Sequence, residues 1–179
     1  VAVVAKNGGD INDYAGGQHP IMHQPYPLVA LPTTAGTGSE VTSVTVITNT
    51  SMNVKMMMKH PAFIPTVAIV DPLLTITAPP HVTAATGIDA LCHAVEAYIS
   101  RKAQPLTDIL ALESIRLIGQ NLHTAYENGE HIGAREKMAR ASMLAGMAFS
   151  NASVCLVHGM SRPIGALFHV PHGISNAML

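Results

Sequence analysis

The pattern of apolar residues changes near residue 72, and this change limits the folds open to the chain. Before it, short runs rich in Val, Ile and Thr lie between turn residues, as is typical of strands; the runs are 28–34, 41–49 and 65–72. After Pro79, apolar residues recur at helical spacing over 80–100, 105–126, 134–150 and 152–167. The sequence therefore predicts an α/β part over residues 1–72 and an all-helical part over residues 73–179.

The composition favours a piece of a longer protein. Charged residues make up 12% of the chain and apolar residues 48%, whereas an average soluble protein is about a quarter charged. The first residues, VAVVA, and the last, SNAML, both lie in apolar runs without capping signals. We therefore expect an internal fragment, truncated at both ends.

Charge and cysteine content exclude some classes of protein. Ten Lys and Arg balance eleven Asp and Glu, without a basic stripe, so nucleic acid is not an expected partner. Cys92 and Cys155 lie in apolar contexts, which favours reduced thiols in a cytoplasmic protein. The longest uncharged stretch, 141–161, is interrupted by Ser, Asn and His, so we expect a buried helix there and no membrane partner.

Two pairs of residues have the spacing of a metal site. Asp89 and His93 stand four apart in a helix-forming stretch, so their side chains share one helix face. His158 and His172 flank a segment with two prolines, so this pair is expected to straddle a bend. Three imidazoles and one carboxylate suit Fe(II) or Zn(II) better than Ca²⁺ or Mg²⁺. Spacing alone leaves a structural role open for each pair, as a local ion pair or a core histidine.

The segment PTTAGTGSEVT, residues 32–42, is typical of a ligand-binding loop. It follows an apolar run, its glycines Gly36 and Gly38 would let the backbone approach a ligand, and its hydroxyls could bind phosphate, ribose or an amide. An ordinary Gly-rich connection is the alternative. The segment is neither a Walker loop nor the GxGxxG of a dinucleotide fold.

With these motifs and the segments NGGDINDYAG, TAATGIDALCHAVEAYIS and HGMSRPIGALFHVPHGISNAML, the chain resembles the iron-containing, group III alcohol dehydrogenases from end to end. That family includes lactaldehyde reductase and 1,3-propanediol dehydrogenase. The resemblance implies a dehydroquinate synthase-like architecture: the remnant of a nucleotide-binding α/β domain, followed by part of an all-α metal-binding domain.

The resemblance also implies an activity and a site. The activity is reversible oxidation of an alcohol to an aldehyde or ketone, with NAD or NADP taking the hydride and the metal, Fe(II) or Zn(II), polarising the substrate oxygen. The implied metal ligands are Asp89, His93, His158 and His172. The implied cofactor contacts are Thr33, Thr34, Thr37, Thr42, Lys55 and Leu74. We expect a homo-oligomer acting on a small alcohol or aldehyde.

Two features depart from the family pattern. Arg162 stands where relatives often carry a histidine thought to move a proton, and a guanidinium cannot serve as a base. We expect Arg162 to attract an anionic group and His169 to take over proton movement. The family's diphosphate-binding GGGS loop would precede Val1, so we expect this chain alone to bind NAD poorly and to turn over little.

Three other functions remain open from the sequence. A non-catalytic fragment would keep only the metal site. A glycerol dehydrogenase-like enzyme would share the fold and use another substrate. A metal hydrolase would need a carboxylate base, for which Glu96 is nearest in sequence, although Glu96 could simply pair with Arg101.

Overall fold

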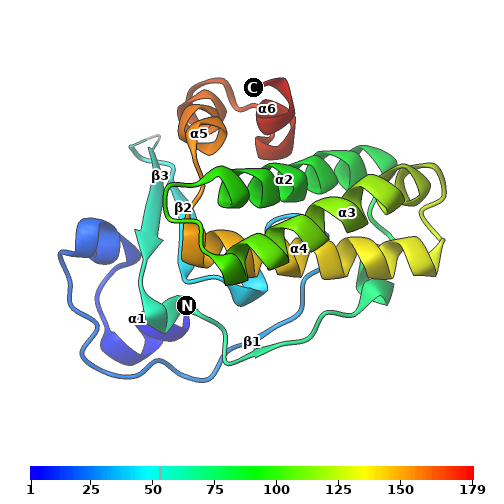
Figure 1. Cartoon of the computed structure of the whole chain (residues 1–179). Coiled ribbons are helices and arrows are strands. Elements are labelled where there is room, and N and C mark those ends of the chain that lie inside the picture. Colours follow the sequence, from blue (N-terminus) through cyan, green and yellow to red (C-terminus); the bar gives the residue numbers. More distant parts are fainter. Residues whose placement is uncertain (53) are drawn as a thin grey trace.

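The computed structural model describes residues 1–52 and 54–179, which form a helical half and a smaller strand half (Figure 1). We call residues 1–72 the strand half and residues 73–179 the helical half. In chain order the elements are α1 (Ala2–Asn7), the 3-10 helix η1 (Ile11–Gly17), β1 (Val29–Ala30), η2 (Ser39–Val41), β2 (Val44–Asn49), β3 (Val54–Lys59), η3 (Pro61–Phe63), β4 (Val67–Ala68), η4 (Pro72–Thr75), α2 (Pro80–Ile99), α3 (Pro105–Glu127), α4 (Ile132–Ala152), α5 (Leu156–Phe168) and α6 (His172–Met178).

Three long helices, α2, α3 and α4, pack against one another and form the main core. Pro80 and Pro105 open α2 and α3 at positions where a missing N–H costs nothing. The core between them is built from Ala90, Leu117, Ile118 and Met138, all nearly inaccessible to solvent. These helices confirm the expected helical stretches to within a few residues.

The chain turns sharply between α4 and α5, where the sequence suggested one buried helix over 141–161. The helix ends at Ala152 because Ser153 adopts a left-handed φ of 75°. The axes of α4 and α5 differ by 103°. Among the described residues, no single helix is long and apolar enough to cross a membrane; only α4 and α5 taken together have that length and composition, and they are bent. The turn is what brings α5 back over α2.

Helix α6 lies against α2 at very close range. A Cβ at Gly173 would sit 2.1 Å from the carbonyl oxygen of Ala85, so only glycine permits this contact. His169, which ends α5, has a left-handed φ of 55° and redirects the chain toward α6. The two short helices α5 and α6 therefore lie over one side of α2 (Figure 1).

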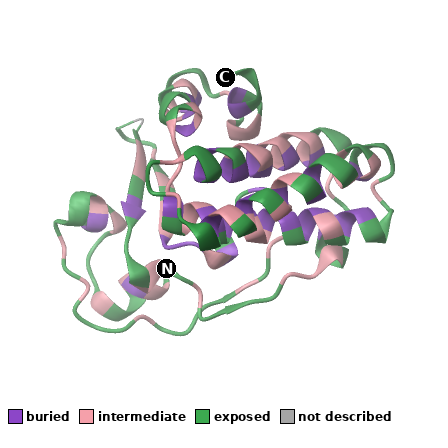
Figure 2. Ribbon diagram, viewed as in Figure 1, coloured by how far each residue is buried: buried purple, intermediate pink, exposed green. Residues whose placement is uncertain are grey.

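The strand half contains two small sheets. Strands β2 and β3 form an antiparallel hairpin with Val44 opposite Lys59 and Asn49 opposite Val54. Strands β1 and β4 pair in parallel over two residues each, much less than the expected strands 28–34 and 65–72. Pro32 has no N–H with which to continue the ladder, and the chain beyond it leaves the sheet to pack against helices. Figure 2 shows that buried residues concentrate on the helices.

Candidate metal centre

The four residues predicted as metal ligands come together in space from three helices. Asp89 and His93 leave one face of α2, while His158 lies on α5 and His172 is the first residue of α6. Their nearest nitrogens surround Asp89 Oδ1: His158 Nε2 lies at 3.5 Å, His172 Nε2 at 3.7 Å and His93 Nδ1 at 3.9 Å. Candidate ligand atoms of Asp89, His93 and His158 all lie within 4.8 Å of one another. One pair thus lies on a helix and the other spans a bend.

The cluster is enclosed on the side of α2 and open near α6. Asp89, His93 and His158 are buried, whereas 35% of the His172 side chain is exposed. The His93 ring stacks on Phe149 and on His158, with ring centroids 4.3 Å apart in both cases. Aromatic packing therefore fixes the His93 imidazole, and the His172 side is the more open side of the cluster.

Burial and mutual charge set the protonation of the cluster. Burial lowers the pKa of His93 to about 4 and also lowers the pKa of His172 below its usual value. Burial by itself raises the pKa of Asp89, but the three neighbouring histidines, His158 above all, lower it by more, so the net pKa falls below its usual value. His93 and His172 are therefore neutral and Asp89 is ionised at pH 7, which is the state that metal ligands require.

Two buried polar atoms of the cluster make no hydrogen bond with the described residues: His93 Nδ1 and Asn176 Oδ1. Buried polar atoms are normally paired, and an orphan is commonly explained by a missing ion or water. Imidazole nitrogens beside an ionised carboxylate are donors that suit a divalent transition metal. The residues present therefore fit such a metal.

Asn176 is a member of the cluster that the sequence analysis missed. Its Nδ2 donates a hydrogen bond to Asp89 Oδ1 at 2.6 Å and lies 3.3 Å from His158 Nε2 and 3.5 Å from His172 Nε2. The signal was available, because Asn176 follows His172 by four residues and so shares its helix face. This buried amide contacts three of the four predicted ligands and helps to hold them together.

Glu96 has a different role from either one considered in the sequence. Its side chain contacts α5 and not Arg101: Oε2 pairs with His158 Nδ1, and Oε1 accepts a hydrogen bond from the backbone N–H of Val157 at 2.7 Å. Both oxygens of this buried carboxylate are therefore engaged. Glu96 is not free to activate a water molecule, which removes the residue on which the hydrolase alternative depended.

The Gly- and Thr-rich loop packs against the helical half, and this contact explains its glycines. A Cβ at Gly36 would lie 2.6 Å from the Cβ of Thr86 on α2, and one at Gly38 would lie 2.6 Å from the Cα of Gly146 on α4. Gly38 also has a left-handed φ of 60°. We expected close approach to a ligand, but the described chain shows close approach to two helices. The close contact of Gly36 and Gly38 with the helices holds the hydroxyl groups of the loop at a fixed distance from α2 and α4.

A cavity of about 590 Å³ extends from this loop to the Asp–His cluster. Thr37, Thr42 and Lys55 line one part of it, and Arg162 lies beside the cluster. All four predicted metal ligands line the other part: Asp89, His93, His158 and His172. The remaining candidates, Thr33, Thr34, Leu74 and His169, do not line this cavity. Their roles remain predictions.

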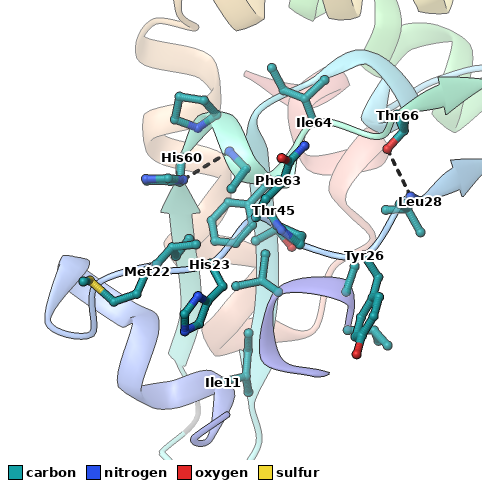
Figure 3. Close-up of a pocket in the computed structure, with 18 of the residues that line it drawn as sticks. Ile11, Met22, His23, Tyr26, Leu28, Thr45, His60, Phe63, Ile64 and Thr66 are labelled. Atoms are coloured by element: carbon teal, nitrogen blue, oxygen red, sulfur yellow. Dashed lines mark hydrogen bonds between the residues drawn. The ribbon is translucent and has the colours of Figure 1, made fainter. Parts of the chain in front are cut away.

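A second cavity, of about 450 Å³, lies in the strand half between α1, β2 and the segment 21–28 (Figure 3). Its lining is mixed: Ile11, Tyr26 and Phe63 point into it beside His23 and His60. The side chain of His60 is already used, because Nδ1 accepts a hydrogen bond from Ala62 N at 3.1 Å. None of the predicted site residues lines this cavity.

Comparison with known proteins shows the family of the chain. Residues 1–72 match the family model described as iron-containing alcohol dehydrogenase, and residues 83–179 match that of the Fe-containing alcohol dehydrogenase family, C-terminal. The chain is 50% identical over 179 residues to a 1,3-propanediol dehydrogenase of Klebsiella pneumoniae. The alignment covers 100% of this chain and 46% of that protein. The chain thus spans less than half the length of this relative.

Two further similar proteins are described with NAD. A NAD-dependent methanol dehydrogenase of Bacillus methanolicus is 47% identical, with coverage of 99% of this chain and 46% of that protein. The crystal structure of a sulfoacetaldehyde reductase from Bifidobacterium kashiwanohense, in complex with NAD⁺, superposes with a TM-score of 0.94 at 39% identity, covering 99% of this chain and 47% of that chain. On sequence and on fold, the chain belongs to the iron-containing alcohol dehydrogenase family.

Proposed function

We propose that this chain supplies the metal centre and part of the nicotinamide site of a dehydrogenase that reversibly oxidises a small alcohol to an aldehyde or ketone. The observation that carries this proposal is the shared cavity, in which Thr37, Thr42 and Lys55 lie on one part of the wall and the Asp–His cluster on the other. A hydride acceptor and an alcohol could meet there in one enclosed space. Relatives named 1,3-propanediol dehydrogenase and NAD-dependent methanol dehydrogenase support this class of substrate.

The proposed metal ligands are Asp89, His93, His158 and His172. The metal would be Fe(II), with Zn(II) as the second choice, because imidazole nitrogens and a carboxylate suit both ions. When bound, the metal would polarise the oxygen of the alcohol or carbonyl. The partly exposed His172 leaves the substrate a route to the cluster, and Phe149, whose ring stacks on His93, lines the same cavity.

The proposed cofactor contacts are Thr33, Thr34, Thr37, Thr42, Lys55 and Leu74, with NAD preferred over NADP. Thr37 Oγ1 donates a hydrogen bond to Ser39 Oγ at 3.1 Å and accepts one from Ser39 N at 3.3 Å, so the loop is pre-ordered before a ligand binds. The Lys55 ammonium extends from β3 to Gly165 of α5. It lies so close that a Cβ added at Gly165 would be 2.9 Å from Lys55 Nζ. We expect Lys55 to bind the nicotinamide ribose and to orient the ring toward the cluster.

Arg162 is proposed to attract an anionic group of the substrate or cofactor. It lies one turn after His158 on α5, and its Nε donates to His158 O at 2.9 Å, which fixes the guanidinium beside the cluster. Three cations line the cavity, Lys55, Lys59 and Arg162, against the single carboxylate of Asp89. His169 is proposed to move the proton. An unchanged substrate profile and unchanged rates in Arg162→Lys would remove the anion-binding role.

We further propose that residues 1–72 and 73–179 correspond to two domains, and that the chain forms a homo-oligomer. Apolar side chains exposed along the outer faces of α2 and α3 support self-association: Tyr98 and Ile99, with Leu106, Ile109 and Leu112. Cys92 and Cys155 are both free thiols, which supports a reducing compartment such as the cytoplasm.

The proposal is tested first by the metal content of the anaerobically purified chain. We expect about one iron or zinc per chain, retained in His123→Ala, an exposed histidine of α3, and lost in His158→Ala. Reduction of NAD⁺ by methanol and by 1,3-propanediol is then followed by absorbance. A chain that folds but holds no stoichiometric metal would contradict the proposed centre.

A further inference from the structure

Glu96 joins α2 to the start of α5 by several contacts. It lies one turn after His93 on α2, is almost fully buried, and directs its carboxylate at residues 157 and 158. Oε1 accepts the backbone N–H of Val157 at 2.7 Å, and Oε2 pairs with His158 Nδ1. The Glu96 backbone oxygen adds a contact to Cys155 Sγ at 3.3 Å. The two carboxylate oxygens therefore do different things: one satisfies the helix terminus, and the other contacts an imidazole.

The imidazole contact fixes which nitrogen of His158 carries hydrogen. A carboxylate oxygen accepts the hydrogen bond in this contact, so Nδ1 is the His158 nitrogen that carries the hydrogen. Nε2 then has a free lone pair, and this atom is the one that lies 3.5 Å from Asp89 Oδ1 within the cluster. Histidines that bind metals commonly have their second nitrogen held in this way.

We propose that Glu96 is a positioning residue, which holds His158 in the Nδ1–H tautomer so that the Nε2 lone pair faces the metal centre. The inference rests on the proposed function for the metal, but the tautomer itself is a property of the chain without metal. The proposal gives a role to Glu96, a carboxylate that does not line the cavity proposed for substrate and cofactor.

Glu96→Gln is the sharpest variant, since it changes one oxygen into an amide nitrogen and leaves the shape unchanged. The amide oxygen can still accept the Val157 N–H and satisfy the terminus of α5. The amide NH₂ then faces His158 Nδ1 and donates to it, which forces hydrogen onto Nε2 and removes the lone pair that a metal needs. Glu113→Gln is the matched control, because Glu113 lies on the surface of α3 and pairs with Arg116.

The first measurement is the ¹⁵N chemical shifts of the His158 ring in the metal-free chain, assigned by comparison with His158→Ala. We expect Nδ1–H in the native chain and in Glu113→Gln, and Nε2–H in Glu96→Gln. A native ring with hydrogen on Nε2, or on both nitrogens, would overturn the proposal, and this reading does not depend on the variant folding. An unchanged tautomer in folded Glu96→Gln would overturn it as well.

The second measurement is Zn²⁺ affinity, by competition with a chromophoric chelator. Glu96→Gln is expected to bind about 10- to 100-fold more weakly than the native chain, as for other partners of metal-bound histidines, while Glu113→Gln is unchanged. Equal affinity in Glu96→Gln would overturn the role at the metal. If the native chain bound no Zn²⁺ although Glu96→Gln switched the tautomer, the proposed metal centre would fail while Glu96 still positioned His158.

Discussion

The two halves of the molecule differ in how far they bury their apolar residues. In the helical half, Ala90, Ala94 and Ala97 of α2 are fully inaccessible, and Asp89 and His93 of the cluster lie beside this packed face. In the strand half, the buried core consists of Val3, Tyr14 and Met58, whereas Val29 of β1 is 50% exposed and Val67 of β4 is 46% exposed. The Asp–His cluster is therefore held by a closely packed framework, whereas most of the strand half is packed less closely.

The loop 32–42 is the exception that explains the cavity. It belongs to the strand half by sequence, but Gly36 and Gly38 fasten it to α2 and α4. The proposed cofactor contacts Thr37 and Thr42 thus take their position from the helices. We conclude that the geometry of the cavity depends on helix packing more than on the sheets.

The largest expected effect is on the packed half, from Arg135→Ala. This buried guanidinium donates hydrogen bonds to Thr83 Oγ1 at 2.7 Å, Gly129 O at 2.8 Å and Ala78 O at 3.0 Å. The variant leaves these acceptors unpaired, so we expect a loss of about 3 kcal/mol in the free energy of unfolding. Urea denaturation followed by circular dichroism measures it. The exposed Arg140→Ala is the control, and equal losses in the two variants would contradict the comparison.

A pair of glycine variants tests the contact between loop and helices. A Cβ at Gly146 of α4 would lie 2.8 Å from Gly38 O, whereas one at Gly119 of α3 meets nothing within 4 Å. Alanine is the better helix former, so Gly119→Ala should stabilise the chain by up to about 1 kcal/mol. Gly146→Ala should destabilise it by about 2 kcal/mol because the backbone must shift.

The free energy of unfolding of both variants, measured side by side, decides the point. Stabilisation by Gly146→Ala would mean that the loop 32–42 does not pack tightly against α4 at this position. Destabilisation by both variants to the same extent would show that the effect belongs to helix glycines in general and not to the contact with Gly38.

The pH dependence of the metal-free chain should be governed by the cluster. The pKa of His93 falls from 6.5 to about 4 on burial. Above about pH 6.5 neither the folded nor the unfolded state protonates it, but as the pH falls toward 4 the unfolded state takes up a proton that the folded state does not. The free energy of unfolding should therefore decrease over this range, by up to about 1.4 kcal/mol per pH unit. His172 acts in the same direction.

Denaturation curves across this pH range measure the slope, which His93→Asn should reduce and the exposed His123→Asn should not. The same slope in all three chains would assign the acid sensitivity to groups outside the cluster.

The smallest effect is expected in the strand half, from Tyr14→Phe. The Tyr14 hydroxyl donates to Gly8 O at 2.8 Å, and its loss should cost about 1 kcal/mol locally. Because Tyr14 lies away from α2, Zn²⁺ affinity should stay unchanged. Hydrogen exchange reports the local loss and chelator competition reports the affinity. A weaker metal affinity would show that the two halves are more strongly coupled than their packing suggests.

Much of this protein can be predicted from its sequence, because the signals are local. The long helices follow from apolar residues at helical spacing and from Pro80 and Pro105 at their starts. The positions of Asp89 and His93 on one face follow from the geometry of a single helix. The family likewise follows from contiguous motifs.

Other features were decided only by the tertiary structure, because they join residues far apart in the chain. Glu96 meets His158 across 62 positions, and Asn176 meets Asp89 across 87. The sequence marked Gly36 and Gly38 as sites of close approach, but only the fold shows that the partners are Thr86 and Gly146. Residue spacing fixes the direction of a side chain on its own helix, whereas its partner depends on how separate helices pack.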